Sequence, residues 1–289
     1  MTYSSYSRRA PKHHKAKRWL VAFVPLVIIG GIIYWMTIGG DRAEAPSEGN
    51  NTTQQPEEPL YTAPNLQPVI EAWLAEQTHD YNILIKDRQS DTIIASHNPG
   101  KIDLGASFYK LFVSYLAYQD FQDGSRDPDV LLSGGRTWLE CIDPMLRVSD
   151  NDCGEAMVIK MGVSALHDRL VPLGMPNTTF NRTYTTVADT LTILELMYDG
   201  VNLNEKNHQA VLDALLNQPE EYKLGLQAGA PEGKWYSKAG WNVGALYNDA
   251  AVLVLPDGRE FTVVIMGPNS YQPAVVADFG KTIYADLTQ

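Results

Sequence analysis

The sequence predicts an α+β fold that contains one antiparallel five-stranded sheet, flanking helices and an all-helical lobe. Two observations support this prediction. Apolar residues follow strand-like patterns in two segments near the start of the folded region and in three segments near its end. Between these two groups, and at both ends of the region, apolar residues recur at helical spacing. We therefore expect strands from both chain ends to share one sheet, with the intervening helices inserted as a lobe.

The predicted elements follow one another in a simple order. The first helix covers 66–78, and two strands follow at 81–87 and 91–98. Helices are then expected at 107–121, 150–162, 164–171, 186–199 and 205–217. The remaining elements are strands at 234–241, 244–256 and 260–268 and a helix at 271–287. The sequence PDGRE predicts a hairpin turn between the last two strands. A cleft between sheet and lobe is the expected place for an active site.

The N-terminal region has a different composition from the rest of the chain. Residues 1–18 hold six of the 23 Lys and Arg residues and no acid, and residues 19–38 hold no charged residue. A helix of that length spans about 30 Å, the hydrocarbon thickness of a bilayer. We expect 19–38 to be a transmembrane anchor that leaves a basic tail, 1–18, in the cytoplasm. A cleaved signal peptide ending near AEA at 43–45 is the alternative, and a buried core helix is disfavoured.

The segment after the anchor predicts a flexible linker. Residues 39–59 are polar, contain Pro and Gly, and are nearly devoid of apolar residues, so they cannot bury a core. Residues 60–289 are then the folded domain, outside the cytoplasm. The chain has a net charge of -11, but the tail holds six basic residues and no acid, so the rest of the chain carries a net charge of -17 and this domain is strongly acidic. Nucleic-acid binding by the folded domain is therefore not expected.

Three short motifs contain residues suited to catalysis. In the segment LGASFYKLF, Ser107 and Lys110 are three residues apart, which places both side chains on one face of a helix. A neutral lysine amine there can take the serine proton. The second motif is the triplet that begins at Ser149, and the third is the triplet that begins at Lys238 in a predicted strand. Ser149 as a helix N-cap and Lys238 as a solvated strand lysine are the structural alternatives.

Together the three motifs resemble those of the penicillin-recognising serine enzymes, the class A β-lactamases and serine DD-peptidases. The S-x-x-K, S-D-N and K-x-G patterns occur in the family's order, and the resemblance covers about 62–289. It also includes the TYTTVADTLTILELMYDG segment, which is similar to the helix after the long loop of the class A lobe. The resemblance implies a β-lactamase/transpeptidase-like fold.

The resemblance also implies a role for each motif residue. Ser107 would be the nucleophile and Lys110 its activator. Ser149 would relay a proton to the leaving nitrogen, Asn151 would hold a substrate amide, and Lys238 would attract a carboxylate.

The strand motif would provide the remaining substrate contacts. Ala239, Gly240 and Trp241 would bind substrate along the strand, and the backbone N–H groups of Ser107 and Trp241 would form the oxyanion hole.

Two departures from the family pattern bear on the reaction. Ala239 replaces the threonine of K-T-G, which removes a hydroxyl that binds the substrate's carboxylate. The loop at 171–187 contains no Asp or Glu, whereas class A β-lactamases carry a glutamate there that activates the deacylating water. Asp168 and Asp189 flank this loop as expected helix residues. Without a general base, hydrolysis of the acyl-enzyme should be slow.

The only two cysteines, Cys141 and Cys153, bracket the segment that carries Ser149. An oxidising compartment outside the cytoplasm favours a disulfide between them. Closing a loop of 13 residues stabilises the fold by about 3 kcal/mol in the chain-entropy model. The disulfide either preorganises the catalytic segment or only stabilises the fold, and the sequence leaves both readings open.

Other kinds of site are not predicted. The six histidines do not occur at metal-ligand spacing, and there is no G-x-S-x-G motif or phosphate-binding glycine loop, so no metal or cofactor is expected. Several aromatic residues are candidates for the cleft or the core: Phe108, Tyr109, Trp235, Tyr236 and Trp241.

The sequence therefore predicts an extracytoplasmic serine hydrolase or acyltransferase that acts on an amide of a peptidoglycan peptide or a β-lactam. A class A-like β-lactamase with weak or altered deacylation is the alternative. A non-catalytic cell-wall-binding module of the same fold is a further one.

Overall fold

The computed structural model of the chain describes residues 61–269 and 271–289. The predicted basic tail (1–18), anchor (19–38) and linker (39–59) lie outside the described residues. Within the described ranges, no helix is long and apolar enough to cross a membrane.

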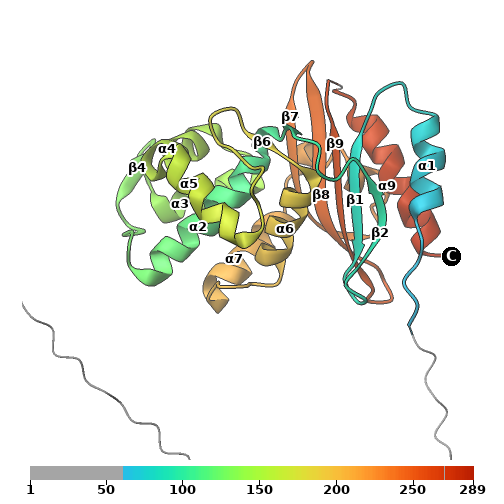
Figure 1. The fold of residues 1–289 in the computed structure, drawn as a ribbon. Coiled ribbons are helices and arrows are strands. Elements are labelled where there is room, and N and C mark those ends of the chain that lie inside the picture. The colour runs from blue at the N-terminus through green and yellow to red at the C-terminus, as the bar shows by residue number, and fades with distance from the viewer. Residues whose placement is uncertain (1–60, 270) are drawn as a thin grey trace, which may run out of the picture. The chain divides into compact units, whose positions relative to one another are not determined.

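A five-stranded sheet forms the centre of the fold (Figure 1). Its strand order is β2-β1-β9-β8-β7, and every neighbouring pair is antiparallel. The strands are β1 (Asn82–Asp87), β2 (Thr92–His97), β7 (Lys234–Asn242), β8 (Leu246–Val254) and β9 (Glu260–Gly267). β1 pairs directly with β9, so the predicted sheet built from both ends of the chain is confirmed.

Both faces of the sheet are buried, because side chains on a strand alternate between faces and each face is covered. Ile83 and Ile265 belong to a core shared with α1 (Gln67–Ala75) and α9 (Pro273–Leu287). Leu84 belongs to a second core, shared with the helical lobe. Figure 1 shows α1 and α9 on one side of the sheet and the lobe on the other. Buried residues on both faces explain why these strands read as nearly continuous apolar runs.

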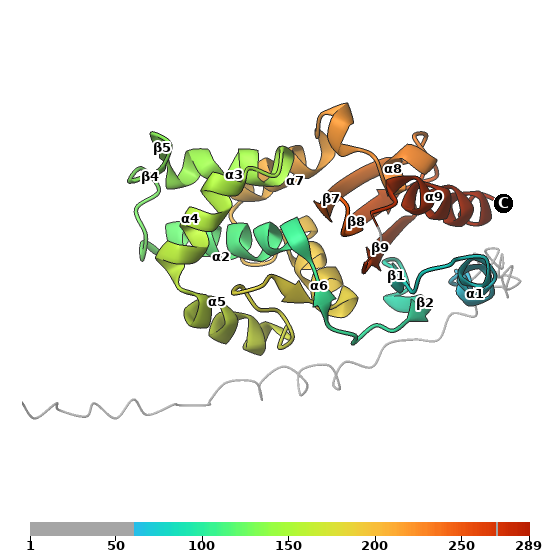
Figure 2. The same ribbon diagram turned by 90° about the horizontal axis from the view of Figure 1, so that it is seen from above.

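The lobe is built around helix α2 (Tyr109–Asp123), which is buried over most of its surface. Figure 2 shows α2 surrounded by the other helices of the lobe. These are α3 (Trp138–Arg147), α4 (Asn151–Met161), α5 (Val163–Leu170), α6 (Val187–Tyr198) and α7 (Glu205–Leu216). A helix that is apolar on all sides needs neighbours on all sides, so α2 holds its N-terminal residues in a rigid position.

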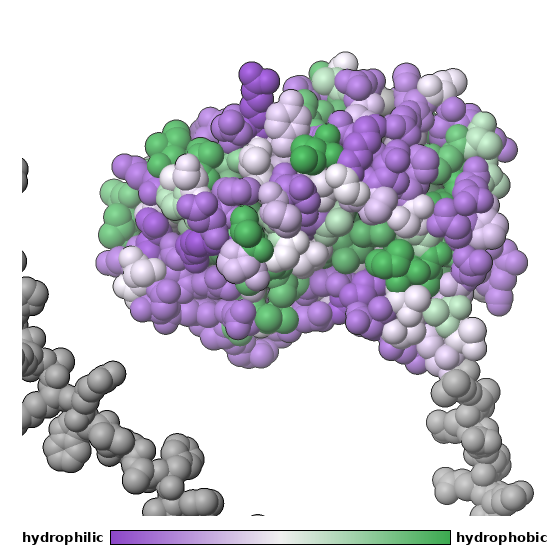
Figure 3. Space-filling view, viewed as in Figure 1, coloured by the Kyte–Doolittle hydropathy of each residue, from purple (hydrophilic) through white to green (hydrophobic). Residues whose placement is uncertain are grey.

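Short elements complete the fold. They are β3 (Asp103–Leu104) paired with β6 (Tyr184–Thr185), β4 (Leu131–Ser133) paired with β5 (Arg136–Thr137), the 3-10 turns η1 (Ala106–Phe108), η2 (Val171–Leu173) and η3 (Glu220–Tyr222), and helix α8 (Leu226–Gly229). Hydrophilic residues cover most of the face seen in Figure 3, consistent with apolar side chains gathered in the two cores.

Helix α3 is an element that the periodicity of the sequence did not predict. It contains Pro144, which removes one backbone donor and makes the segment look like a loop. The helix starts with a capping box, in which Thr137 and Glu140 each bond the other's backbone N–H. The T-x-x-E pattern was the signal that could have revealed it.

The predicted disulfide between Cys141 and Cys153 is confirmed. Cys141 lies inside α3, which was not predicted, and Cys153 lies in the first turn of α4. Both cysteines are fully buried. The disulfide therefore joins two helices across the turn that carries Ser149.

Removing the disulfide tests its role in stability and catalysis. The double variant Cys141→Ala, Cys153→Ala is expected to lose about 3 kcal/mol of unfolding free energy, measured by denaturant titration. If the disulfide also holds the Ser149 turn, acylation of Ser107 will slow in the same variant. Wild-type protein that has been reduced is the control, since it keeps both sulfurs. An acylation rate equal to that of the oxidised wild type would leave the disulfide only a stabilising role.

Candidate active site

The structure places Ser107 on a strained turn at the start of α2. Ser107 lies in η1, and the residue before it, Ala106, has a left-handed φ of 47°. Such a conformation is uncommon for a residue with a side chain, and strained residues of this kind cluster at active sites. Strand β7 packs against this turn at Gly240, where an added Cβ would lie 2.4 Å from the Gly105 carbonyl oxygen and 3.2 Å from Ser107 N. Glycine is therefore required where the strand meets the Ser107 turn.

Lys110 lies one helical turn after Ser107 and is fully buried. Its Nζ is 2.9 Å from Ser107 Oγ, 2.8 Å from the Ser149 carbonyl oxygen and 2.7 Å from Asn151 Oδ1. The two carbonyl-type oxygens can only accept hydrogen bonds. A neutral amine has two N–H groups and one lone pair, so donating to both oxygens leaves the lone pair for the Ser107 hydroxyl. This geometry suits Lys110 as the base that deprotonates Ser107.

The Ser149 turn joins α3 to α4, and Ser149 itself has a left-handed φ of 60°. The alternative that Ser149 caps α4 is wrong, because Asp150 is the N-cap and accepts from Cys153 N at 2.9 Å. Asp150 also pairs with Arg136 at 2.9 Å. With the cap supplied by its neighbour, the Ser149 hydroxyl is free to face the two lysines.

Lys238 of β7 completes the cluster. It is 1 % exposed, so the alternative of a solvated strand lysine is wrong. Its Nζ donates to Ser149 Oγ at 2.9 Å and to the Ala239 carbonyl oxygen at 2.8 Å. Ser149 Oγ is also 3.3 Å from Lys110 Nζ. The hydroxyl of Ser149 therefore connects the two lysine amines.

Burial favours the neutral form of both lysines. It lowers the pKa of Lys110 to about 8, against the opposing charges of Asp150 and Glu155. It lowers the pKa of Lys238 well below its ordinary value, and the nearby charge of Lys110 acts in the same direction. A lysine with a pKa close to neutrality can exchange protons with a serine during a reaction.

The side chains of Ala239 and Trp241, which follow Lys238 on β7, pack against other residues of the fold. Ala239 is 3 % exposed and belongs to the core on the α9 side of the sheet. Trp241 is half-buried, and its ring stacks on Tyr247 and lies 5.5 Å from the ring of Tyr222.

The other candidate aromatics, Phe108, Tyr109, Trp235 and Tyr236, are all core residues, and Tyr109 also lines a pocket.

The loop at 171–187, which contains no acidic residue, is anchored by the carboxylate of Asp189, two residues after its end. Asp189 is 2 % exposed and accepts from Asn177 N at 2.8 Å and from Thr178 Oγ1 at 2.9 Å. Its other oxygen accepts from the Thr186 hydroxyl at 3.1 Å. A carboxylate used in this way anchors the loop and is not available to activate water. Asp168 lies in α5 and is exposed.

A family model described as the β-lactamase enzyme family matches residues 65–287. The chain belongs to the β-lactamase enzyme family. It is a serine hydrolase that cleaves amides through an acyl-serine intermediate. No curated protein matches this β-lactamase-family enzyme by sequence.

Solved structures of the same fold are similar to this enzyme over most of its length. A mutant of PBP-A in an acyl-enzyme complex with penicillin G has a TM-score of 0.69 at 16 % identity, over 78 % of this chain and 99 % of the other. TLA-1 extended-spectrum β-lactamase has a TM-score of 0.70 at 16 % identity, over 78 % and 98 %. An ancestral class A β-lactamase has a TM-score of 0.68 at 18 % identity, over 76 % and 99 %. At these identities the likeness concerns the fold.

Two acidic residues near the site were not singled out from the sequence. Glu155 lies in α4 close to Lys110, and Asp249 is fully buried in β8 beside Ala239. Asp249 Oδ2 accepts from Leu226 N at 2.9 Å, and in the described chain Asp249 Oδ1 has no hydrogen-bond partner. An isolated Asp in an apolar strand pattern was the available signal for this buried acid.

Asp249 predicts an unusual dependence of stability on pH. Burial raises its pKa to about 7, although the backbone N–H groups of Leu226 and Ala250 oppose the shift. A raised folded-state pKa means that stability is lost as pH rises from about 4 to about 7, by on the order of 4 kcal/mol. The asparagine of the Asp249→Asn variant cannot ionise. The difference in unfolding free energy between wild type and this variant therefore separates the contribution of Asp249 from those of Lys110 and Lys238. Unfolding free energies at pH 4.5 and 7.5 test it, and a pH-independent difference would refute it.

Proposed function

We propose that this enzyme is a membrane-anchored, extracytoplasmic acyltransferase or peptidase that acts on a peptide amide of the cell wall through Ser107. The hydrogen-bond arrangement of Lys110 is the observation that carries the proposal. Its Nζ lies 2.8 Å and 2.7 Å from two oxygens that can only accept and 2.9 Å from Ser107 Oγ, so a neutral amine that donates to both acceptors keeps its lone pair for the Ser107 hydroxyl. The predicted anchor at 19–38 and its basic tail supply the location.

The contacts of the lysines define a route for the proton during acylation. Lys110 takes the proton of Ser107 as Ser107 Oγ bonds to the substrate carbonyl carbon. Lys110 passes a proton to Ser149, whose hydroxyl protonates the leaving nitrogen as the C–N bond breaks. The connecting distances are 2.9 Å and 3.3 Å. Lys238 donates to the same hydroxyl, so a proton reaches the leaving group without crossing solvent.

Substrate groups have matching partners around the cluster. The Asn151 side-chain amide donates to no group in the described part of the chain, so it is available to a substrate carbonyl. The backbone N–H groups of Ser107 and Trp241 would stabilise the oxyanion, because β7 lies against the Ser107 turn. The Lys238 ammonium, when protonated, would attract a substrate carboxylate.

The acyl-enzyme is expected to persist in water. Class A β-lactamases use a loop glutamate for deacylation, and the corresponding loop here contains no acid. Asp189, the nearest acid in sequence, is occupied by hydrogen bonds from the loop. This supports a peptidase or acyltransferase over a β-lactamase with efficient turnover.

The test is to incubate the full-length protein with a fluorescent penicillin and to follow its intact mass over time. A long-lived adduct that is absent in Ser107→Ala is the expected result. A transient adduct with released penicilloate would indicate a β-lactamase instead. Cell-wall peptides that end in a free carboxylate are the second substrate to assay. A protein that reacts with neither would contradict the proposal and favour a wall-binding role.

A further inference from the structure

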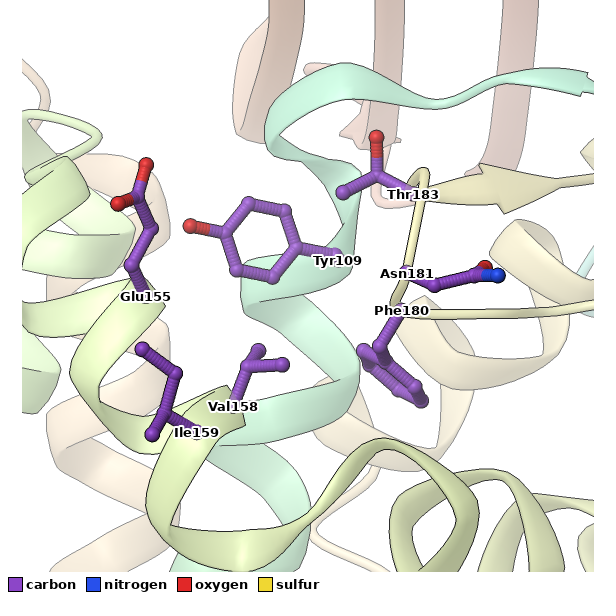
Figure 4. Close-up of a pocket in the computed structure, with 7 residues that line it drawn as sticks. All are labelled: Tyr109, Glu155, Val158, Ile159, Phe180, Asn181 and Thr183. Atoms are coloured by element: carbon purple, nitrogen blue, oxygen red, sulfur yellow. The ribbon is translucent and has the colours of Figure 1, made fainter.

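A pocket of about 290 Å³ lies beside the Ser107 turn, between helix α4 and the loop that precedes β6 (Figure 4). Figure 4 shows the Tyr109 ring between the α4 side chains and the loop side chains, with its hydroxyl directed toward the Glu155 side. The residues that line the pocket are Tyr109, Glu155, Val158, Ile159, Phe180, Asn181 and Thr183.

The pocket combines one carboxylate with apolar walls. Glu155 is exposed to solvent and forms no ion pair or hydrogen bond with any residue that the structure describes. Val158 and Ile159 follow it on α4, and Phe180 lies opposite them on the loop. Burial, followed by the charges of Glu155 and Asp150, raises the pKa of Tyr109, so its hydroxyl stays protonated. The pocket therefore offers a negative charge and a neutral phenol at the end of an apolar wall.

The pocket is tied to the Ser107 turn by close packing at Gly154 and by a backbone hydrogen bond at Gly105. An added Cβ at Gly154 would lie 2.4 Å from Tyr109 Oη and 3.0 Å from Lys110 Cε, so α4 packs directly on both side chains. On the opposite side, Gly105 N donates to the Thr183 carbonyl oxygen at 2.8 Å. Helix α4 therefore contacts both a residue that lines the pocket, Tyr109, and the lysine that is hydrogen-bonded to Ser107, Lys110.

We propose that this pocket, here called the Glu155 pocket, binds a primary alkylammonium group carried by the substrate of Ser107. The ammonium donates to the Glu155 carboxylate, and its methylene chain packs against Ile159 and Phe180. An alkyl chain without a charge would leave the carboxylate unpaired, and a carboxylate-bearing group would be repelled by Glu155. The identity of the pocket as a substrate site rests on the proposed function, whereas ammonium binding does not.

A cation bound in the pocket also changes the protonation of Lys110. The ionisable groups around Lys110 are Asp150 and Glu155, which favour its charged form, Lys238, which disfavours it, and the neutral phenol of Tyr109. A bound ammonium neutralises the effect of Glu155 on Lys110. The fraction of neutral Lys110 then rises, so a substrate with the right cation activates the base that attacks it.

Binding is tested on the full-length protein with n-pentylammonium and 1-pentanol, by ligand-observed NMR at pH 7. We expect the amine to bind, the alcohol to bind at least fivefold more weakly, and Glu155→Gln to remove this preference. Asp152→Asn, a charge change at an exposed acid on the same helix, is the matched control and should keep it. Ile159→Lys, at a position that is 75 % exposed, should block the site with its own ammonium. Equal binding of amine and alcohol, or amine binding unchanged in Glu155→Gln, would overturn the proposal.

Coupling to the nucleophile is tested by penicillin labelling across pH. Saturating n-pentylammonium should move the rise of the labelling rate to lower pH in wild type and leave it unmoved in Glu155→Gln. An unmoved profile in wild type would refute the coupling. If the protein reacts with neither penicillin nor cell-wall peptides while the amine still binds, the proposed function falls and the ammonium site stands. If labelling succeeds while the amine does not bind, only the ammonium site falls.

Discussion

Replacing Lys110 with methionine is expected to slow acylation of Ser107 by about 100- to 10,000-fold, the range that general bases contribute. Methionine keeps most of the volume of the buried side chain and removes the amine. Among the residues that the structure describes, the Ser107 hydroxyl then has no base within hydrogen-bond distance, since its partner at 2.9 Å is Lys110 Nζ. The measurement is the second-order rate of labelling by a fluorescent penicillin.

The same rate should depend on pH in a defined direction. Only the neutral amine accepts the serine proton, and the pKa of Lys110 is lowered to about 8. Labelling by wild type should therefore rise with pH and reach half its maximum near pH 8. Lys160→Met removes an exposed lysine of α4 and should leave both rate and profile unchanged. A rate that is flat from pH 6 to 9.5, or a Lys110→Met variant that labels normally, would show that another group is the base.

Adding one methyl group at Gly240 is expected to reduce the rate of acylation by about 100-fold, although Gly240 has no side chain that could take part in the reaction. The new Cβ would lie 2.4 Å from the Gly105 carbonyl oxygen, too close for two non-bonded atoms. Strand β7 and the Ser107 turn must then move apart, which displaces the nucleophile from both lysines and the oxyanion donors. Displacements near 1 Å cost rate factors of this size.

The variant Gly240→Ala is best compared with Gly100→Ala. A Cβ at Gly100 meets no atom within 4 Å, so that variant should acylate like wild type. Circular dichroism and melting temperature establish that both variants are folded. Normal labelling by a folded Gly240→Ala would mean that the close contact between β7 and the turn does not position Ser107.

The outline of the fold could be predicted from the sequence because its strands and helices have strong apolar periodicity. The five strands and the two end helices occur where the pattern placed them. Helix α3 could not be found in this way, since Pro144 interrupts its pattern and its capping box is a two-residue signal. The short pairs β3–β6 and β4–β5 were also missed, because two or three residues carry no periodicity.

The motif residues could be selected from the sequence, but their environments could not. Whether Lys238 is solvated depends on which face of β7 it occupies and on what covers that face. The choice between Ser149 and Asp150 as N-cap depends on backbone angles, and both residue types are good caps. The Glu155 pocket is formed by two segments far apart in sequence, so no local pattern reveals it.

The pairing of β1 with β9 has a consequence for how the protein is made. Asn82 pairs with Met266, so the middle of the sheet joins segments separated by nearly the whole folded domain. A ribosome that has released the first strands must synthesise the entire lobe before their partner exists. Contacts of such long range are slow to form, and the waiting chain exposes unpaired strand edges. We therefore expect folding to begin only after translation is almost finished, and any chain that stops before β9 to remain unfolded.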